Sequence, residues 1–259
     1  MDKPIYSSPD SLAENGIYLP LDLRFDAGEV EELLNACLAY GDFSTIMGLL
    51  KRRFVCVLKR NDSISKSLTK ICTYCEAPFE KILRHYNLVE LLTMTTIAKA
   101  AGQEFHADHI AGGGMEWLTV AVCLTDINKD CGAFEFIPGT HKILNNDPSN
   151  VYRKIIAQDL GDYANVDDAE ALELSAGSVF CYNGKLLHRG TANNSEQQYR
   201  SILFFTFGPT WDEWARYAKE EEPEIFETVR WCTFNGSGKV HSDYASCTLR
   251  DFVEKAMKE

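Results

Sequence analysis

Two histidines and one aspartate have the types and spacing of a metal site. His106 and Asp108 are separated by one residue in the run EFHADHI. If this run is a β-strand, both side chains point to the same side, because side chains alternate between the two faces of a strand. His188 lies 80 residues after Asp108, in the strand-like run LLHRGT. Two imidazoles and one carboxylate suit iron(II) with open coordination positions for reactants, whereas thiolates favour zinc or iron–sulfur clusters.

The remaining histidines are weaker candidates as metal ligands. His109 is expected to point away from the metal by the same alternation, His85 falls in a helical segment, and His241 lies in a polar tail. His141, in the turn PGTH, is the alternative third ligand. A histidine in such a turn is readily explained by a hydrogen bond to the backbone. We therefore expect His188 to be the third ligand.

A candidate anchor for an organic acid follows the second histidine. Arg200 lies twelve residues after His188 and opens the apolar run SILFFTF. If these two runs are neighbouring strands, the guanidinium of Arg200 can project toward the metal and form paired, charge-assisted hydrogen bonds with a diacid such as 2-oxoglutarate. The alternative is a surface arginine at the start of a strand. Arg189 competes for the same role, but as the strand neighbour of His188 it should point to the opposite face.

These residues fall in a part of the chain that is typical of antiparallel β-structure. From about residue 90, short runs rich in β-branched and aromatic residues alternate with Gly, Asn, Asp and Pro. Seven or eight such strands suit a double-sheet jelly roll, in which two packed sheets enclose a pocket. The predicted fold class is therefore mainly β, with a jelly-roll core and flanking helices.

Helical periodicity is expected on both sides of this core. Residues 27–40 place apolar side chains on one helical face, and Gly41 should end that helix. Residues 66–86 repeat the pattern, with Pro78 as a predicted kink or break. The chain is predicted to form one domain with a helical N-terminal part at about 20–88, the β core at about 90–208, and C-terminal helices at about 210–259.

Composition excludes several classes of partner. Lys plus Arg number 26 against 38 Asp plus Glu, a formal net charge of -12, which repels the phosphate backbone of nucleic acids. No apolar stretch is long enough for a signal sequence or a bilayer span. The nine cysteines are scattered, and the Cys72-x-x-Cys75 pair is better explained as two thiols on a helix face than as half a zinc site or a redox pair. We expect a cytoplasmic protein, a monomer or homodimer, with no membrane partner.

In this order the motifs resemble the phytanoyl-CoA dioxygenase-like family of iron(II)/2-oxoglutarate-dependent oxygenases. The resemblance spans about residues 90–208 and rests on FHAD at 105–108, CGAFEFIPGTH at 131–141, SAGSVFCYN at 175–183, and LLHRGTANNS at 186–195 followed by Arg200. It implies a double-stranded β-helix of cupin type. It also implies that His106, Asp108 and His188 are the catalytic iron ligands and that Arg200 binds the distal carboxylate of 2-oxoglutarate.

The resemblance also suggests two weaker contacts and shows one departure. Thr191 and Lys99 match positions that contact 2-oxoglutarate in similar proteins. Relatives commonly place the arginine eleven residues after the distal histidine, and a one-residue bulge before the strand would absorb the extra residue in this chain. Asp108 excludes a similar halogenase, because those enzymes lack the carboxylate.

The implied activity is oxidation of a substrate C–H bond by hydroxylation, desaturation or oxidative cyclisation. It would consume 2-oxoglutarate and O2 and release succinate and CO2. Gly113, in a run of three glycines, and Trp117 are the expected substrate contacts. The acidic charge disfavours an acyl-CoA, so we expect a small metabolite such as an amino-acid derivative or specialised metabolite. The alternatives are a cupin-like metal-binding protein or metallohydrolase without 2-oxoglutarate turnover, and a catalytically silent binding protein.

Overall fold

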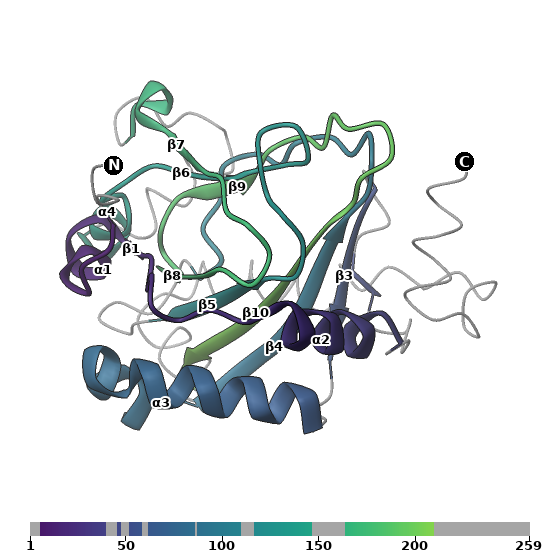
Figure 1. Cartoon of the computed structure of the whole chain (residues 1–259). Coiled ribbons are helices and arrows are strands. Elements are labelled where there is room, and N and C mark those ends of the chain that lie inside the picture. The colour runs from purple at the N-terminus through teal and green to yellow at the C-terminus, as the bar shows by residue number, and fades with distance from the viewer. Residues whose placement is uncertain are drawn as a thin grey trace.

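Two antiparallel sheets pack against each other in the computed structural model (Figure 1). The model describes residues 6–39, 46–47, 52–58, 62–85, 87–109, 117–146 and 164–209. The larger sheet has the order β1 (Ile17–Tyr18), β8 (Val179–Asn183), β5 (Leu118–Cys123), β10 (Arg200–Gly208), β4 (Asn87–Thr96), β3 (Arg53–Val57) and β2 (Ile46–Met47). The smaller sheet has the order β7 (Glu170–Leu172), β6 (Phe134–Phe136) and β9 (His188–Gly190). The predicted jelly-roll core with flanking helices is confirmed.

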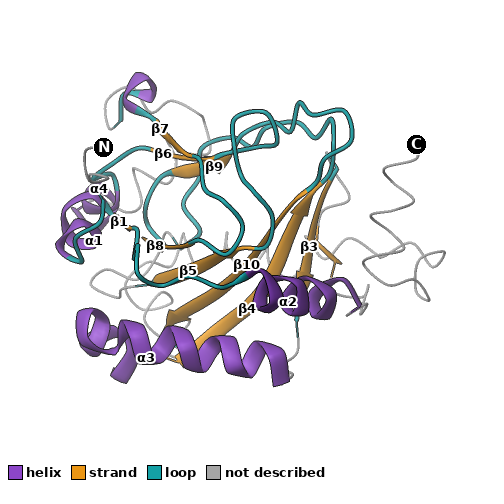
Figure 2. Ribbon diagram, viewed as in Figure 1, coloured by secondary structure: helices purple, strands orange, loops and turns teal. Residues whose placement is uncertain are grey.

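Helices cover the outer face and one end of the larger sheet, as Figure 2 shows. They are α1 (Asp10–Asn15), α2 (Ala27–Ala39), α3 (Asp62–His85) and α4 (His141–Asn146), with a short 3-10 helix at Val166–Asp168. The predicted break at Pro78 is wrong, because α3 is one continuous helix of 24 residues. The first half of α3 is held on the sheet by Ile64 and Ile71, which belong to the hydrophobic core. None of the described helices is long and apolar enough to cross a bilayer.

Strand β10 explains why the core is apolar on both sides of the larger sheet. All nine of its residues are buried, as expected for a central strand covered on both faces. Leu203 and Phe205 join the cluster that α2 and α3 cover, whereas Ile202 and Phe204 join the cluster between the two sheets. The period of two thus directs the even-numbered residues of β10, beginning with Arg200, toward the interior of the jelly roll.

Two local predictions differ from the structure. The N-terminal third contains strand β3 as well as helices, and β3 pairs with β4 so that Arg53 lies opposite Thr96. The run EFHADHI is not a regular strand over its described residues 104–109, whose one ladder contact is an isolated antiparallel bridge between His106 and His188. The predicted helices at 210–259 and the predicted helix end at Gly41 lie outside the described residues.

Candidate metal centre and active site

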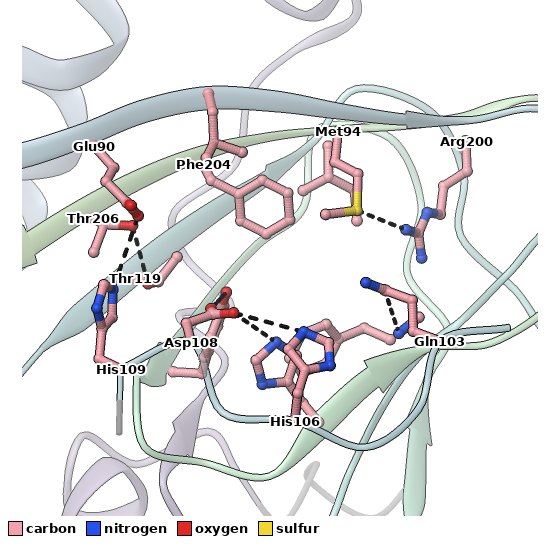
Figure 3. Close-up of a pocket in the computed structure, with 16 residues that line it drawn as sticks. Glu90, Met94, Gln103, His106, Asp108, His109, Thr119, Arg200, Phe204 and Thr206 are labelled. Atoms are coloured by element: carbon pink, nitrogen blue, oxygen red, sulfur yellow. Dashed lines mark hydrogen bonds and ion pairs between the residues drawn. The ribbon is translucent and has the colours of Figure 1, made fainter. Parts of the chain in front are cut away.

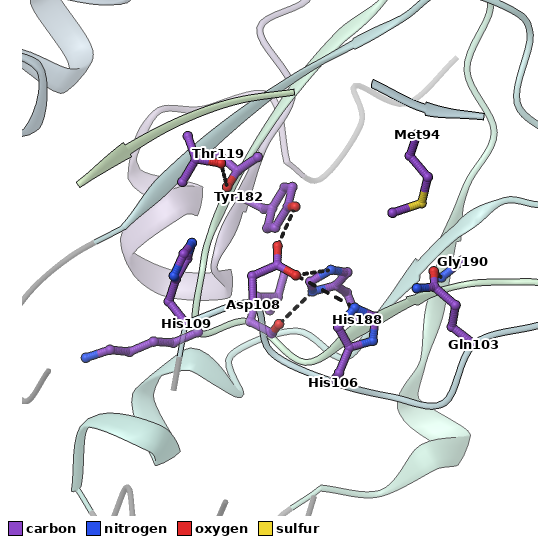
Figure 4. A network of polar contacts seen from close by, with 12 residues as sticks. Met94, Gln103, His106, Asp108, His109, Thr119, Tyr182, His188 and Gly190 are labelled. Carbon is purple, nitrogen blue, oxygen red and sulfur yellow. Dashed lines mark hydrogen bonds and ion pairs between the residues drawn. The ribbon is translucent and has the colours of Figure 1, made fainter. Parts of the chain in front are cut away.

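An antiparallel bridge brings the two predicted histidine ligands together. The His106 N–H donates to the carbonyl of His188 at 3.0 Å, and the His188 N–H donates to the carbonyl of His106 at 2.9 Å. Their rings lie 4.6 Å apart between centroids. Asp108, two residues after His106, places its carboxylate beside both rings (Figure 4). Residues 80 apart in sequence therefore meet at one point at the mouth of the jelly roll.

Each imidazole presents one defined nitrogen to this point. The Nδ1 atom of His106 lies 2.9 Å from the Glu104 carbonyl, and that of His188 lies 2.9 Å from the Leu186 carbonyl. Both backbone contacts fix the ring orientation and leave the Nε2 atoms facing Asp108 Oδ1, at 3.7 Å and 3.5 Å. Among the described residues, these three side chains are the group whose donor atoms, all within 4.8 Å of one another, fit a metal ion. Two neutral nitrogens and a hard oxygen suit iron(II).

The second oxygen of Asp108 is held by a tyrosine. The hydroxyl of Tyr182 donates to Asp108 Oδ2 at 2.7 Å, and its ring packs against His188 with centroids 4.9 Å apart. An outer contact of this kind orients a metal-binding carboxylate and leaves Oδ1 available for the ion.

The protonation states suit cation binding. Burial alone would raise the pKa of the Asp108 carboxyl, but His188, His106, His109 and the Tyr182 hydrogen bond together hold it below its usual value. Burial lowers the pKa of His188 to about 4, against the opposing pull of Asp108. The carboxylate is thus ionised and the His188 ring neutral at physiological pH, which are the forms that bind a divalent metal.

Replacing Tyr182 by phenylalanine is expected to weaken metal affinity without unfolding the protein. The ring contacts would remain, but Asp108 would lose its outer hydrogen bond, a loss that typically costs roughly 10- to 100-fold in affinity. Anaerobic calorimetric titration with iron(II) measures this change. The control is Tyr199→Phe, which removes a hydroxyl outside the cavity and should leave affinity unchanged. Equal affinities for both variants and the native protein would disprove the role of Tyr182.

The metal-free protein is expected to lose stability as pH falls from about 6.5 to about 4. Burial lowers the pKa of both His188 and His109 to about 4, so the unfolded chain binds up to two more protons than the folded one in this window. Two protons correspond to a slope of at most about 2.7 kcal/mol per pH unit in the free energy of unfolding. Denaturant titrations across the window measure it, and His188→Gln should roughly halve the slope. A flat profile would contradict the expectation.

A cavity of about 250 Å³ opens beside the three metal-binding residues (Figure 3). Its apolar lining comes mainly from β4 and β10, and Phe204 stands across from the metal-binding residues. Arg200 lines one end, together with Gln103 and Gly190. Arg200 and the three metal-binding residues therefore line the same cavity, as the sequence predicted.

Arg200 is a buried cation that contacts no carboxylate in the part of the chain that the structure describes. It is 2% exposed. Its Nη1 donates to the Gly132 carbonyl at 2.7 Å, its Nη2 donates to the Thr96 hydroxyl at 3.3 Å, and its Nε has no partner among the described residues. Burial lowers the pKa of Arg200 to about 10. Its unused donor capacity and uncompensated charge fit an organic carboxylate in the cavity.

A second buried arginine, which the sequence did not reveal, lies beside the first. Arg53 on β3 donates to the same Thr96 hydroxyl at 3.2 Å, and to the carbonyls of Gly190 and Thr191 at 3.0 and 2.7 Å. Burial and the charge of Arg200 lower the pKa of Arg53 to about 9. None of the contacts that the structure gives these two guanidiniums within its described residues is a carboxylate, so this end of the cavity attracts an anion.

A small residue is required at Gly190, where the two guanidiniums converge beside the cavity. A Cβ atom on Gly190 would lie 2.6 Å from Arg53 Nη1, 2.8 Å from Gln103 Oε1 and 3.3 Å from Arg200 Nη2. The Gly190 N–H donates to that same Gln103 oxygen at 3.0 Å. Gly190 therefore keeps the space open in which the guanidinium and the Gln103 amide approach a ligand.

Two predicted cosubstrate contacts lie away from the cavity. Lys99 is in a turn with a φ of 62°, and its ammonium pairs with Glu196 on the surface. β4 ends at Thr96, so strand alternation does not carry Lys99 inward. The Thr191 hydroxyl contacts the Ala133 carbonyl at 3.5 Å, and Thr191 does not line the cavity. We therefore keep neither residue as a proposed 2-oxoglutarate contact.

The other predicted residues have mixed outcomes. Trp117 is buried and stacks on His109 with ring centroids 3.9 Å apart, so it supports the cavity wall from behind. His109 itself lines the cavity, against the expectation, because the segment is not a regular strand. His141 is not one of the residues grouped at the metal site. Its Nε2 atom lies 3.2 Å from the Ala13 carbonyl, a backbone contact of the kind expected for a structural histidine. Gly113 lies outside the described residues.

Comparisons with known proteins agree with this geometry. A model of the phytanoyl-CoA dioxygenase (PhyH) family matches residues 18–202, which contain His106, Asp108, His188 and Arg200. A search of curated proteins finds no match.

Solved structures share the fold at low sequence identity. HygX from Streptomyces hygroscopicus, with nickel, 2-oxoglutarate and hygromycin B bound, is 17% identical with a TM-score of 0.59, covering 77% of this chain and 85% of that one. The non-heme alpha ketoglutarate dependent carbocyclase SnoK from nogalamycin biosynthesis is 16% identical with a TM-score of 0.59, covering 78% and 82%. The epimerase SnoN, in complex with Fe3+, alpha ketoglutarate and nogalamycin RO, is 18% identical with a TM-score of 0.59, covering 78% and 82%.

The family match extends over well more than half of the 259 residues and includes every residue of the metal site. The structural neighbours show independently that the fold is the same. The chain belongs to the phytanoyl-CoA dioxygenase (PhyH) family of dioxygenases.

Proposed function

We propose that the protein is an iron(II)- and 2-oxoglutarate-dependent dioxygenase that oxidises a C–H bond of a small metabolite. The observation that carries the proposal is one cavity with two complementary parts. His106, Asp108 and His188 offer a cation site, and Arg200, with Arg53 beside it, supplies buried positive charge that contacts no carboxylate of the described residues. A metal-chelating diacid satisfies both parts at once.

Each residue then has a definite task. His106, Asp108 and His188 would hold the iron ion, which when bound supplies activation of O2 coupled to conversion of 2-oxoglutarate into succinate and CO2. Arg200 would bind the distal carboxylate of the diacid and fix its direction in the cavity. The Gln103 amide, whose oxygen is already engaged by Gly190, would present its N–H groups to the same ligand.

The remaining lining limits access of water to the reacting atoms. Leu92, Phe134, Ile202 and Phe204 give the cavity an apolar wall on either side of the metal-binding residues. A dry wall strengthens the electrostatic interactions of Arg200 with an anion and protects reactive species from side reactions. The geometry with which this wall holds the substrate would decide between hydroxylation, desaturation and oxidative cyclisation.

The substrate we propose is a small molecule of specialised metabolism. Support comes from the neighbours: HygX is described with hygromycin B bound, and SnoK and SnoN belong to nogalamycin biosynthesis. A cytoplasmic location and a monomeric or homodimeric state remain predictions, and the net charge of -12 still argues against nucleic acid.

The proposal is tested by supplying iron(II), ascorbate, O2 and 2-oxoglutarate to the purified protein and measuring succinate. Slow succinate formation without a prime substrate, dependent on iron and lost in an Arg200→Ala variant, is the expected result. A cupin-like metal-binding protein or metallohydrolase would form no succinate, with or without candidate substrates. That outcome would overturn the assignment.

A further inference from the structure

Two paired strands form a continuous wall along the cavity. In register, Arg200 of β10 lies opposite Thr96 of β4, and six residues further along β10 Thr206 lies opposite Glu90. The residues between them that line the cavity are Leu92, Met94, Ile202 and Phe204. The wall thus has a basic end, an apolar middle and an acidic end, as the labelled side chains in Figure 3 show.

The two ends are too far apart for one short diacid to reach both. Six residues of strand at about 3.3 Å each place Thr206 roughly 20 Å from Arg200 along β10. A diacid that reaches from Arg200 to the metal-binding residues occupies the basic half only. The half that contains Glu90 and Thr206 is therefore free for the substrate.

Glu90 gives the substrate half its charge. Apart from Asp108, which faces the metal site, Glu90 is the one acidic residue among the described residues that line the cavity, and Arg200 is the one Lys or Arg. The Glu90 side chain is 48% exposed, so its carboxylate remains accessible to a ligand. No lysine or arginine of the described lining lies at its end to neutralise it.

The position of the Glu90 carboxylate is fixed by a polar chain. Glu90 is hydrogen-bonded to Thr206, and the Thr206 and Thr119 hydroxyls are 3.2 Å apart. Thr119 is hydrogen-bonded to Tyr182, whose hydroxyl donates to Asp108. The acidic end is consequently held in a defined relation to the metal-binding residues, as substrate positioning requires.

A histidine held by stacking lies beside Glu90. His109 Nε2 lies 3.9 Å from the Glu90 Oε2 atom, beyond hydrogen-bond distance, and has no hydrogen-bond partner among the described residues. Its ring stacks on Trp117 with planes 7° apart, and Trp117 in turn packs on Gly208, where a Cβ atom would lie 2.3 Å from the indole. At this separation His109 does not take up the hydrogen-bonding capacity of the Glu90 carboxylate, which stays available to a ligand that approaches from the cavity.

The electrostatics of Glu90 support a cationic ligand. Although about half of the Glu90 side chain is exposed, partial burial in the wall raises the pKa of its carboxyl; the negative charge of Asp108 raises it further, and the hydrogen bond to Thr206 opposes both. An ammonium group beside Glu90 would compensate the charge that these surroundings disfavour.

We propose that the Glu90 end of the cavity is a recognition subsite for a protonated amine on the substrate. The inference rests on the proposed function, because it takes the cavity to be the substrate site. It narrows the substrate class to small amines whose carbon chain lies along the apolar middle of the wall. The ammonium group binds Glu90 and Thr206, and the carbon to be oxidised lies toward the metal-binding residues.

The test uses n-hexylamine and hexan-1-ol as matched probes, titrated into the metal-free protein and into the protein loaded with nickel and 2-oxoglutarate. Ligand-detected NMR gives the two dissociation constants. The variants are Glu90→Gln and the control Glu173→Gln, which removes an exposed carboxylate outside the cavity that pairs with Lys129. Thermal midpoints verify that the variants are folded.

The native protein and Glu173→Gln are expected to bind the amine at least about tenfold more tightly than the alcohol, as a charge-assisted hydrogen bond predicts. Glu90→Gln should remove this preference yet still bind 2-oxoglutarate with iron(II). Equal binding of amine and alcohol by the native protein, no binding of either, or a preference that survives in Glu90→Gln would overturn the subsite. Failure of the dioxygenase proposal is seen separately, as absent succinate formation and absent 2-oxoglutarate binding.

Discussion

Replacing Asp108 by alanine is expected to abolish 2-oxoglutarate turnover. The variant loses the carboxylate of the cation site and leaves two histidines whose Nε2 atoms face an empty position. The loss in metal affinity should exceed the roughly 10- to 100-fold that removal of an outer contact costs, because a ligand itself is removed. Succinate formation and anaerobic iron(II) titration measure the two effects.

The matched control for this variant is Asp22→Ala, which removes an exposed aspartate outside the cavity. It should retain native metal affinity and native succinate formation. If Asp108→Ala behaved like Asp22→Ala, the carboxylate would not belong to the metal site, and the assignment of His106 and His188 as its partners would fail with it.

Replacing Arg200 by alanine is expected to have the second largest effect, on the KM for 2-oxoglutarate. Removing one partner of a buried, hydrogen-bonded charge pair costs about 2–5 kcal/mol, which corresponds to a KM increase of at least roughly 30-fold. Arg200→Lys should recover only part of this loss, because an ammonium keeps the charge but lacks the planar pair of donors. Steady-state succinate formation at varied 2-oxoglutarate measures both variants.

Arg189→Ala is the control for the arginine variants. Arg189 pairs with Glu135 and lies over the Phe105 ring at 4.3 Å, on the opposite side of β9 from the cavity. Its removal should leave the KM for 2-oxoglutarate unchanged. Because Arg200 also holds Gly132 and Thr96, thermal midpoints are needed to separate loss of binding from loss of folding. A native KM in a folded Arg200→Ala variant would refute the anchor.

The metal site could be predicted because its signal is local. His106 and Asp108 are two residues apart, and the jelly-roll pattern places His188 on an adjoining strand. Arg200 was predictable for a similar reason, since strand pairing sets which residues of β10 face inward. The ladder of β10 with β4 begins at Arg200, so the bulge expected before this strand stays a prediction; within the ladder the register shifts between Thr206 and Phe207.

The residues that support the site could not be predicted, because tertiary packing alone brings them there. Arg53 lies in strand β3, which the sequence did not predict because the surrounding region was expected to be helical. Gln103 lies in an irregular segment. In the sequence, Tyr182 is one aromatic residue of an apolar strand. No neighbouring residue indicates that its hydroxyl donates a hydrogen bond to Asp108. Glu90 resembles an ordinary exposed strand residue until β10 is placed beside it.

One wrong prediction comes from applying strand alternation outside a regular strand. Alternation predicted that His109 points away from the metal, but the ladder at this point is a single bridge at His106, and His109 lines the cavity. Lys99 was matched by its position in similar proteins alone; in the structure it lies after the end of β4 with a φ of 62°, and its ammonium pairs with Glu196. The period of two holds only where the ladder is continuous.

The central claim is that one cavity binds iron(II) and 2-oxoglutarate together. The direct measurement is the absorption spectrum of the purified protein under anaerobic conditions with both added. The account predicts a new visible band from the chelate, present in the native protein and lost in Asp108→Ala. A native spectrum that equals the sum of its separate components, with no band at any 2-oxoglutarate concentration, would contradict it.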